Sequence, residues 1–352
     1  MEVMKKMKKS IAVLSALAMT LSISATAFAA DNQARGIVID GQKVADTSQI
    51  KNDQLLLPLR SIGEASGYKI GWSAPNHQIT LTKDGKNITI SLDDQTYTFN
   101  DHKSFLQDEI QMINERTYIT SDLVRAILGF KVTSSQDNQL VELTTQKQNT
   151  ITIRNVKDNA KSDQLTLDIQ YPQIEGLADA KVQEEINKAF EQYVTAIKDQ
   201  ALKDQKDNAS TEAGDAYKTE VAINYDIKYN QDNVLSVVFD HYAYTGGAHG
   251  NTVQSSYNFD LQTGQDLKLK DLYSEGKDFT SLINQAIKKQ MDEQKQTENL
   301  LTPFESIAAD QPFYIADNNQ LVVYFQQYEY FPYAMGMPEY AATFDGIPAQ
   351  AK

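Results

Sequence analysis

A tandem repeat near the N-terminus constrains the fold of this chain more than any other feature of its sequence. Residues 55–81 recur 62 positions later as residues 117–143, without a gap in register. The matched positions are Gly67/Gly129, Lys69/Lys131, Ile62/Val124, Tyr68/Phe130, Ile70/Val132 and Ile79/Val141. Constant spacing of this kind predicts two copies of one small structural unit. Neither copy holds a cluster of catalytic residue types.

Local patterns predict how each copy begins. Residues 55–57 are three leucines, typical of a short buried strand, and Pro58 ends that strand before a helix that starts near Ser61. The helix is expected to stop at Gly67 in the first copy and at Gly129 in the second, because glycine is favoured just past a helix end.

Strands are expected to complete each unit. Residues 79–82 and 87–92 alternate apolar and polar side chains around Asp84-Gly85, a strong two-residue hairpin signal. Each copy is thus predicted as strand, helix, then strands. The predicted module covers residues 36–146, since the polar residues 144–150 follow its last strand.

The first 29 residues predict an export signal. Four lysines (Lys5, Lys6, Lys8 and Lys9) precede an apolar stretch at residues 11–23, and Ala27-Phe28-Ala29 has the form of a small-x-small cleavage site. The alternative is an uncleaved membrane anchor, but several serines and threonines dilute the apolar stretch. We expect cleavage after Ala29 and a secreted protein that is held at the cell wall, if at all, by non-covalent contacts.

Charge and cysteine content limit the possible partners. Without residues 1–29 the chain keeps 29 basic and 46 acidic residues, a net charge of −17. Such a surface repels nucleic acid and favours encounter with cationic partners. The absence of cysteine excludes disulfides and thiolate metal sites, and it suits the exterior of a bacterium.

A second domain is predicted over residues 149–350. Its expected elements are strands at 165–171, 221–229, 234–244, 255–261 and 321–325, a long helix capped by Asp179, a polar loop at 203–216, a turn at 230–233 and a helix at 279–287. The fold class is therefore α+β: a two-copy strand-helix-strands N-terminal module plus an antiparallel sheet with two helices.

The first domain resembles a known family. The segment LLLPLRSIGEASGYKIGW from Leu55 and its second copy resemble the copper amine oxidase N-terminal domain, over roughly residues 36–145. That module is common in tandem in exported Gram-positive proteins. The second copy departs from the pattern, with Thr120-Ser121-Asp122 in place of Pro-Leu-Arg and no Trp after Val132.

The resemblance does not imply an oxidase. Copper amine oxidases need three histidine ligands and a tyrosine within Thr-x-x-Asn-Tyr-Asp/Glu. Asn224-Tyr225-Asp226 is a fragment of that motif, but Val221 stands where the Thr belongs. The four histidines, His77, His102, His241 and His249, fall in different domains. We expect no enzyme, no cofactor and no metal site, and we interpret the fragment as ordinary strand alternation.

The second domain carries a sharper motif. Residues 242–250 (YAYTGGAHG) and 328–336 (YEYFPYAMG) together resemble the extracytoplasmic domain of RsiV-type anti-sigma factors, over roughly residues 149–346. The same domain occurs beside the catalytic domain of some peptidoglycan deacetylases. The RsiV-like case implies binding of a lysozyme-like, cationic wall hydrolase, and the deacetylase case implies an accessory role. The chain lacks the Asp and paired-His motif of a deacetylase.

Seven residues of these motifs are candidates for ligand binding: Tyr242, Tyr244, Gly246, Gly247, His249, Tyr330 and Tyr333. Two glycines let the backbone approach a partner closely, histidine offers a titratable ring, and tyrosine joins apolar area to a polar tip. The structural alternative is a tight connection in which His249 caps carbonyls and the strand tyrosines are core. Tyr330 and Tyr333 are expected at the surface.

The sequence thus predicts a secreted cell-envelope binding protein without catalytic activity, which recognises a wall-associated protein (a lysozyme-like hydrolase) or a glycan such as peptidoglycan. The alternative is an accessory or catalytic protein of peptidoglycan metabolism that uses His249 and a nearby carboxylate. Neither the residues nor the resemblance names the ligand.

Overall fold

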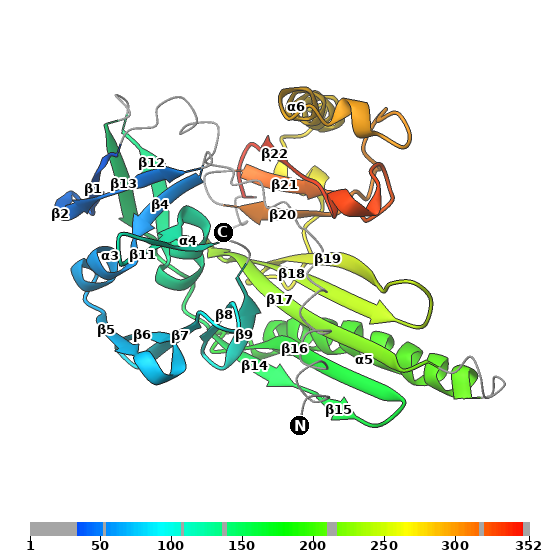
Figure 1. Ribbon diagram of the computed structural model, residues 1–352. Coiled ribbons are helices and arrows are strands. Elements are labelled where there is room, and N and C mark those ends of the chain that lie inside the picture. Colours follow the sequence, from blue (N-terminus) through cyan, green and yellow to red (C-terminus); the bar gives the residue numbers. More distant parts are fainter. Residues whose placement is uncertain are drawn as a thin grey trace. The chain divides into compact units, whose positions relative to one another are not determined.

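The computed structural model describes residues 34–51, 54–106, 109–135, 139–209, 217–316 and 320–347 (Figure 1). The predicted export signal lies outside these residues. The described chain divides into two compact units, an N-terminal unit up to Asn155 and a C-terminal unit from Val156. None of the described helices has the length and apolar character needed to span a bilayer.

Among its described residues the N-terminal unit has three sheets and two short α-helices. The first copy supplies β3 (Gln49–Lys51), β4 (Gln54–Pro58), α3 (Leu59–Ala65), β5 (Lys69–Ser73), β6 (Gln78–Lys83), β7 (Lys86–Ser91), β8 (Thr96–Phe99) and β9 (His102–Phe105). The second supplies β10 (Ile110–Ile113), β11 (Arg116–Thr120), α4 (Ser121–Leu128), β12 (Phe130–Ser134) and β13 (Leu140–Thr145). β1 (Gly36–Ile39) and β2 (Gln42–Thr47) precede both copies. The predicted order of strand, helix, then strands is therefore present in both.

The two copies pair through equivalent strands. β4 and β11 run antiparallel, with Leu57 opposite Ile119, Pro58 opposite Tyr118 and Leu56 opposite Thr120. Leu57 and Ile119 occupy the same position in the repeat, so the register is symmetric about them. β1 then completes the second copy by pairing parallel to β13. The repeat is thus an interlocked pair of copies within one unit.

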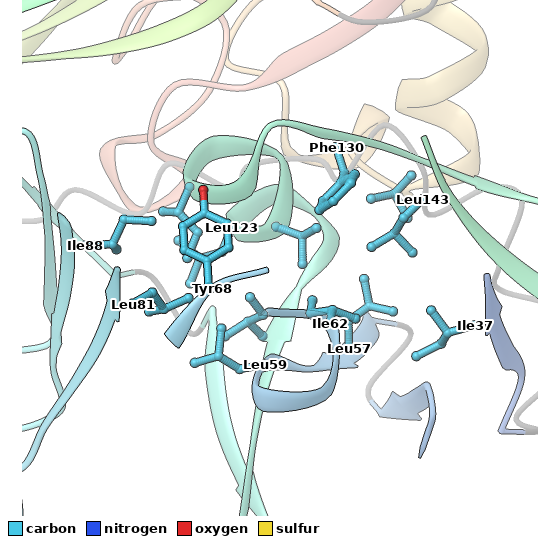
Figure 2. Packing of buried hydrophobic residues seen from close by; sticks show 14 of the residues in the cluster. Ile37, Leu57, Leu59, Ile62, Tyr68, Leu81, Ile88, Leu123, Phe130 and Leu143 are labelled. Carbon is cyan, nitrogen blue, oxygen red and sulfur yellow. The ribbon is translucent and has the colours of Figure 1, made fainter. Parts of the chain in front are cut away.

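Both copies fill one hydrophobic core (Figure 2). Leu57, Ile62 and Leu81 of the first copy lie in the same buried cluster as Leu123 and Phe130 of the second. Every apolar pair that defines the repeat is buried or packed against this cluster. A unit of about 60 residues buries too little surface to be robust alone, which explains why two copies share a core.

The predicted turn residues occupy the backbone geometry that they favour. Gly67 and Gly129 have φ of +83° and +73° just after α3 and α4, so both glycine helix stops are confirmed. Asp84 and Gly85 both have positive φ between β6 and β7, which confirms the hairpin.

The described part of the C-terminal unit has two sheets and two α-helices. The larger sheet has the order β14-β16-β17-β18-β19, with β15 also paired to β16. The smaller has the order β20-β21-β22. The strands are β14 (Thr152–Lys157), β15 (Ala160–Lys161), β16 (Leu165–Glu175), β17 (Thr219–Gln231), β18 (Val234–Tyr244), β19 (Asn251–Asp260), β20 (Phe313–Ala316), β21 (Gln320–Tyr324) and β22 (Glu339–Thr343). The helices are α5 (Ala180–Ala209) and α6 (Phe279–Glu293).

Three details differ from the sequence expectation. The polar segment predicted as a loop at 203–216 continues α5 as far as Ala209, because charged residues extend an exposed helix end as well as they form a loop; residues 210–216 lie outside the described chain. The single predicted sheet is two sheets. β16 and β17 run parallel, since the long α5 carries the chain back between them. The class is α+β with mostly antiparallel strands, as expected.

Helix α5 covers one face of the large sheet (Figure 1). Asp179 caps its start: one side-chain oxygen accepts from the Lys181 backbone N–H at 2.8 Å. Phe190 and Tyr193 of this helix pack against Phe239 of β18, with ring centroids 5.7 and 4.9 Å apart. The odd-numbered residues of β18 therefore face an aromatic core, and the even-numbered residues point to the opposite face.

Candidate functional site

The opposite face of β17, β18 and β19 is polar, and we call it the polar face. Cross-strand register aligns its side chains in three rows: Ala222, Tyr242 and Thr252; Asn224, Asp240 and Gln254; and Asp226, Val238 and Ser256. The smaller sheet packs on the far end of this face, where the Tyr324 hydroxyl donates to Ser256 Oγ at 2.9 Å. Strand periodicity therefore places tyrosine, carboxylate and amide groups side by side on one surface.

Most of the predicted binding residues lie near the row that contains Tyr242, at the end of β18 and in the loop that follows it. The Tyr244 hydroxyl donates to the Gly247 carbonyl at 3.0 Å, which closes the loop between β18 and β19. Burial, with smaller contributions from the neighbouring Glu220, Tyr333 and Tyr244, raises the pKa of Tyr242 to about 12. Tyr242 is thus a neutral hydrogen-bonding group at any physiological pH.

His249 and Tyr333 come together from distant parts of the chain. Their rings lie 4.3 Å apart between centroids, and a second tyrosine, Tyr328, lies 5.7 Å from Tyr333. His249 Nδ1 is 2.8 Å from the Gly250 carbonyl, so this nitrogen carries a proton and donates. Its Nε2 lies 3.5 Å from the Tyr328 hydroxyl. The His249 ring is thus held in place by Gly250, Tyr328 and Tyr333, yet the residue remains exposed.

Two glycines in this loop are required by close packing. A Cβ at Gly246, where φ is +102°, would lie 2.6 Å from the Tyr217 ring. A Cβ at Gly250 would lie 2.3 Å from the Tyr242 ring. Gly247 also has positive φ, but a Cβ there would meet nothing within 4 Å. The loop is therefore fixed against Tyr217 and Tyr242 and open at Gly247.

Tyr330 lies apart from this group. Its ring packs edge-on against Phe325 and Phe304, with centroids 4.8 and 5.5 Å away, at the margin of a hydrophobic core. Tyr333 is half-buried, and its ring packs at a tilt against His249. Six of the seven predicted residues are therefore assembled in one place, and we call Tyr242, Tyr244, Gly246, Gly247, His249 and Tyr333, with Tyr328, the aromatic cluster.

A charged group lies on the same polar face, two residues along β18. Lys228 Nζ is 3.5 Å from Asp226 Oδ2 and lies over the Tyr314 ring at 5.3 Å. The Tyr314 hydroxyl donates to Glu339 at 2.9 Å, and Glu339 is buried. Asp240 accepts from Gln254 Nε2 at 3.3 Å. Asp226, Lys228, Asp240 and Glu339 form what we call the carboxylate group.

The negative charges within the carboxylate group repel one another. Burial, together with repulsion from Asp226 and Glu339, raises the pKa of Asp240 to about 7, although Lys228 and the hydrogen bond from Gln254 act to lower it. The same carboxylates hold the pKa of the Lys228 ammonium above its usual range, despite its burial. Asp240 therefore exchanges its proton near neutral pH.

Sequence reasoning missed the carboxylate group and Tyr328. Asp226 and Asp240 alternate with apolar residues on strands that were correctly predicted, and that alternation was the available signal. Their proximity depends on the register between β17 and β18, which the sequence does not state. Tyr328 adopts φ of +65°, an unusual backbone for tyrosine, and so reaches His249.

The oxidase-like fragment Asn224-Tyr225-Asp226 lies within β17. Tyr225, in the oxidase-like fragment, is 3% exposed and packs beside Phe239 on the aromatic side of the sheet. The fragment is thus ordinary strand alternation, as interpreted from the sequence. Over the described ranges, histidine, aspartate and glutamate form no group of three or more that could hold a metal ion.

Comparison with known proteins identifies three family regions. Residues 38–143 match the copper amine oxidase N-terminal domain, residues 158–252 match deacetylase PdaC, and residues 270–341 match a protein family of unknown function, DUF3298. The last two lie in the C-terminal unit, and the PdaC match includes β17, β18 and the loop of the aromatic cluster.

Two curated proteins of Bacillus subtilis (strain 168) are similar to the chain. The anti-sigma-V factor RsiV is 25% identical over 199 residues, covering 54% of this chain and 66% of RsiV. The peptidoglycan-N-acetylmuramic acid deacetylase PdaC is 32% identical over 62 residues, covering 18% of this chain and 13% of PdaC. The chain thus spans less than two thirds of either relative.

Solved structures of the DUF3298 family resemble part of the chain. One from Bacteroides fragilis NCTC 9343 is 19% identical with a TM-score of 0.41, covering 56% of this chain and 92% of that one. Another, from Pseudomonas aeruginosa PAO1, is 16% identical with a TM-score of 0.41, covering 56% and 89%. The family matches and the two curated relatives show a copper amine oxidase N-terminal domain followed by an RsiV-like region of the kind associated with deacetylases.

Proposed function

We propose that this chain is a secreted, non-catalytic binding protein of the bacterial cell envelope, and that its C-terminal unit recognises a lysozyme-like, cationic wall hydrolase. The N-terminal unit would serve as the wall-docking module. The observation that carries the proposal is the aromatic cluster, in which two distant motifs meet around one exposed histidine.

The geometry of the aromatic cluster suits protein recognition. Its rings are fixed before any ligand arrives, because Tyr244 is hydrogen-bonded to Gly247 and His249 packs against Tyr333. Preorganised aromatic side chains lose little conformational freedom on binding and offer both apolar area and hydrogen bonds. Tyr328 is 51% exposed and available for contact.

Charge supports a basic partner. The net charge of −17 without residues 1–29 attracts a basic protein over a distance that salt screens to about 8–10 Å. Attraction of this kind raises the association rate, whereas contacts at the aromatic cluster set the dissociation rate.

Surface plasmon resonance with a basic lysozyme separates these contributions. We expect His249→Ala and Tyr333→Ala to raise the dissociation rate about 10-fold or more, as loss of a central contact does. Tyr333→Phe, which keeps the ring against His249, should change it little. His77→Asn, in the N-terminal unit, is the histidine control. Added salt should mainly slow association.

Absence of binding at low salt would refute the lysozyme-like partner. Unchanged kinetics in both alanine variants would instead place the interface away from the aromatic cluster. Either result is clear provided that the variants keep the thermal transition of the parent protein.

A catalytic role in peptidoglycan metabolism is the second candidate, and the carboxylate group favours it. An aspartate with a pKa of about 7 is poised for acid-base work near neutral pH. Incubation with purified peptidoglycan, followed by measurement of released acetate or soluble fragments, tests this. Turnover that Asp240→Asn or His249→Ala abolishes would overturn the binding-only proposal.

A further inference from the structure

The tryptophan of the N-terminal unit is exposed although it belongs to a row of core residues. Trp72 of β5 pairs with Ile79 of β6, and the row continues to Ile90 of β7. Ile79 and Ile90 are buried in the hydrophobic core, whereas Trp72 is 51% exposed. β5 is an edge strand of its sheet, so the Trp72 ring lies at the margin of that core.

The second copy of the repeat shows that the fold does not need an aromatic ring at this position. Ser134 of β12 is the equivalent of Trp72. It pairs with Val141, just as Trp72 pairs with Ile79. Ser134 is half-buried, and its Oγ accepts from Arg35 Nη1 at 3.0 Å. The same strand pair thus forms with serine in one copy and with tryptophan in the other, which leaves the Trp72 ring available for a ligand.

A histidine and an aspartate are held beside the Trp72 ring. His77 follows the short helical turn Ala74–Asn76, and its ring lies nearly parallel to that of Trp72, with an interplanar angle of 12° and 6.2 Å between centroids. Because a carboxylate only accepts, His77 Nδ1 donates to Asp93, at 2.9 Å from Oδ1 and 3.1 Å from Oδ2. The His77 carbonyl also accepts from the Leu92 N–H at 3.1 Å, which connects this turn to the turn that carries Asp93. The three side chains are therefore ordered before any ligand arrives.

The polar members of this group have hydrogen-bonding positions that face solvent. The His77 side chain is 57% exposed and the Asp93 side chain 66%. A carboxylate has about four acceptor positions, and the N–H of His77 occupies only part of them. Among the described residues no other hydrogen bond reaches the Asp93 carboxylate or His77 Nε2. An exposed aromatic ring thus lies next to exposed hydrogen-bonding groups.

We propose that Trp72, His77 and Asp93 bind a pyranose ring of the wall glycan, namely an N-acetylglucosamine unit. A pyranose with equatorial substituents has an apolar face of C–H bonds with slight positive charge, which is attracted to the negative face of an aromatic ring. The hydroxyl groups around its rim donate to acceptors beside that face, as Asp93 provides. A sugar that lies flat on Trp72 is also parallel to the His77 ring.

Charge and desolvation argue against other occupants. The net charge of −17 without residues 1–29 and the Asp93 carboxylate repel anionic lipids and anionic wall polymers. An apolar helix or a lipid tail would remove water from the carboxylate without replacing its hydrogen bonds, which is unfavourable. Sugar hydroxyls replace those hydrogen bonds. The group therefore selects a neutral ligand that is flat, apolar on one face and rich in hydroxyl groups.

The inference deepens one part of the proposed function, the docking of the N-terminal unit at the wall, and it rests on that part for the source of the sugar. It does not depend on the lysozyme-like partner of the C-terminal unit, because the residues involved lie in different units.

Tryptophan fluorescence of the full chain tests the site directly, because Trp72 is the single tryptophan in the sequence. Titration with tetra-N-acetylchitotetraose, a soluble chain of β-linked N-acetylglucosamine, should give a saturable change in the tryptophan signal. Sorbitol has the hydroxyl groups of a sugar without a flat ring and should give none. N-acetyl-arginine amide, which tests for a cation over the ring, should bind at least ~10-fold more weakly than the glycan.

Matched variants locate the binding. Trp72→Ser copies the residue of the second copy, so the thermal transition should be kept while affinity for purified peptidoglycan in co-sedimentation falls at least ~10-fold. Phe105→Ala removes a ring that is 60% exposed on β9, the other edge strand of the same sheet, and should leave binding unchanged. Asp93→Ala should weaken tetra-N-acetylchitotetraose about 2–10-fold, since it removes the acceptor and the hydrogen-bond partner of His77.

His77→Asn separates this site from the aromatic cluster. The substitution removes the ring beside Trp72, so it should weaken tetra-N-acetylchitotetraose. Lysozyme binding should keep the kinetics of the parent protein, because His77 lies in the N-terminal unit.

The inference is wrong if the glycan gives no saturable fluorescence change, if sorbitol gives the same change, or if Trp72→Ser and Phe105→Ala affect peptidoglycan binding equally. Equal or tighter binding of N-acetyl-arginine amide would overturn the choice of a sugar. If the chain sediments with peptidoglycan and Trp72→Ser does not reduce this, wall docking stands and only this site fails. If tetra-N-acetylchitotetraose binds at Trp72 but the chain does not sediment with peptidoglycan, the site stands and wall docking fails.

Discussion

The two faces of the large C-terminal sheet contrast sharply although the same strands form them. Phe239 of β18 faces α5 and is enclosed by Phe190, Tyr193 and Tyr257. Its neighbour Asp240 faces the other way, toward Lys228 and Glu339. Because successive strand residues alternate between faces, one strand can stabilise the unit on one side and present charged, titratable groups on the other.

The contrast teaches where substitutions will be tolerated. The aromatic face stabilises through burial and ring packing, which cannot be compensated when a ring is removed. The polar face holds charges that repel one another, so some of its substitutions will increase stability. Four predictions test this difference, from the largest expected effect to the smallest.

Phe239→Ala should reduce the free energy of unfolding of the C-terminal unit by about 3–5 kcal/mol, because it leaves a cavity among four aromatic rings. Urea denaturation followed by tyrosine fluorescence measures the change. Val253→Ala, on an exposed position of β19, is the control and should cost less than ~1 kcal/mol. Equal losses in the two variants would show that the aromatic face is not the main source of stability.

Lys228→Met should destabilise the unit by about 1–3 kcal/mol at pH 8, since it leaves three carboxylates without their cation. The loss should shrink at pH 5, where Asp240 is protonated because its pKa is raised to about 7. Thermal unfolding of the variant and the parent protein at pH 8 and pH 5 measures both losses. A loss that does not depend on pH would mean that Lys228 acts through packing alone.

Asp240→Asn should increase stability at pH 8 by about 1–2 kcal/mol and change the pH dependence. The pKa of Asp240 rises from 3.8 to about 7 on folding, so the folded state keeps a proton that the unfolded chain has lost. Its contribution to stability is therefore fully present below about pH 4 and is lost as pH rises through 7. The variant should lack that decline, as unfolding measured from pH 4 to 8 would reveal. A parallel decline in both proteins would assign the effect to another group.

Tyr244→Phe should cost about 0.5–1.5 kcal/mol, because only the hydrogen bond to the Gly247 carbonyl is lost. The ring would still pack against Tyr217. Differential scanning calorimetry detects a change of this size. If the dissociation rate from lysozyme rises in this variant while stability hardly changes, the bond serves to hold the loop for binding.

Much of the fold follows from local patterns. The tandem unit, both glycine helix stops, the Asp84-Gly85 hairpin and the Asp179 cap were predictable because neighbouring residues alone determine them. The aromatic cluster was predictable as two motifs, and the structure brings six of the seven proposed residues together.

Other features depend on partners that are distant in sequence. The extension of α5 to Ala209, the division into two sheets and the parallel β16–β17 pair each depend on how long elements pack. Tyr330 shares its motif with Tyr333, but its ring packs against Phe325. The segment is irregular, so no strand or helix periodicity predicts which way each of its side chains points.

The sequence by itself determined the repeat, the α+β elements and the residue types of the two tyrosine-rich motifs, because periodicity, caps and turns act over a few residues. Only the tertiary structure decided that Leu57 pairs with Ile119, that His249 packs against Tyr333, and that Gln254 donates to Asp240 among further carboxylates. Strand register and the packing of distant segments set these contacts, and both minimise the free energy of the whole unit rather than of any local stretch.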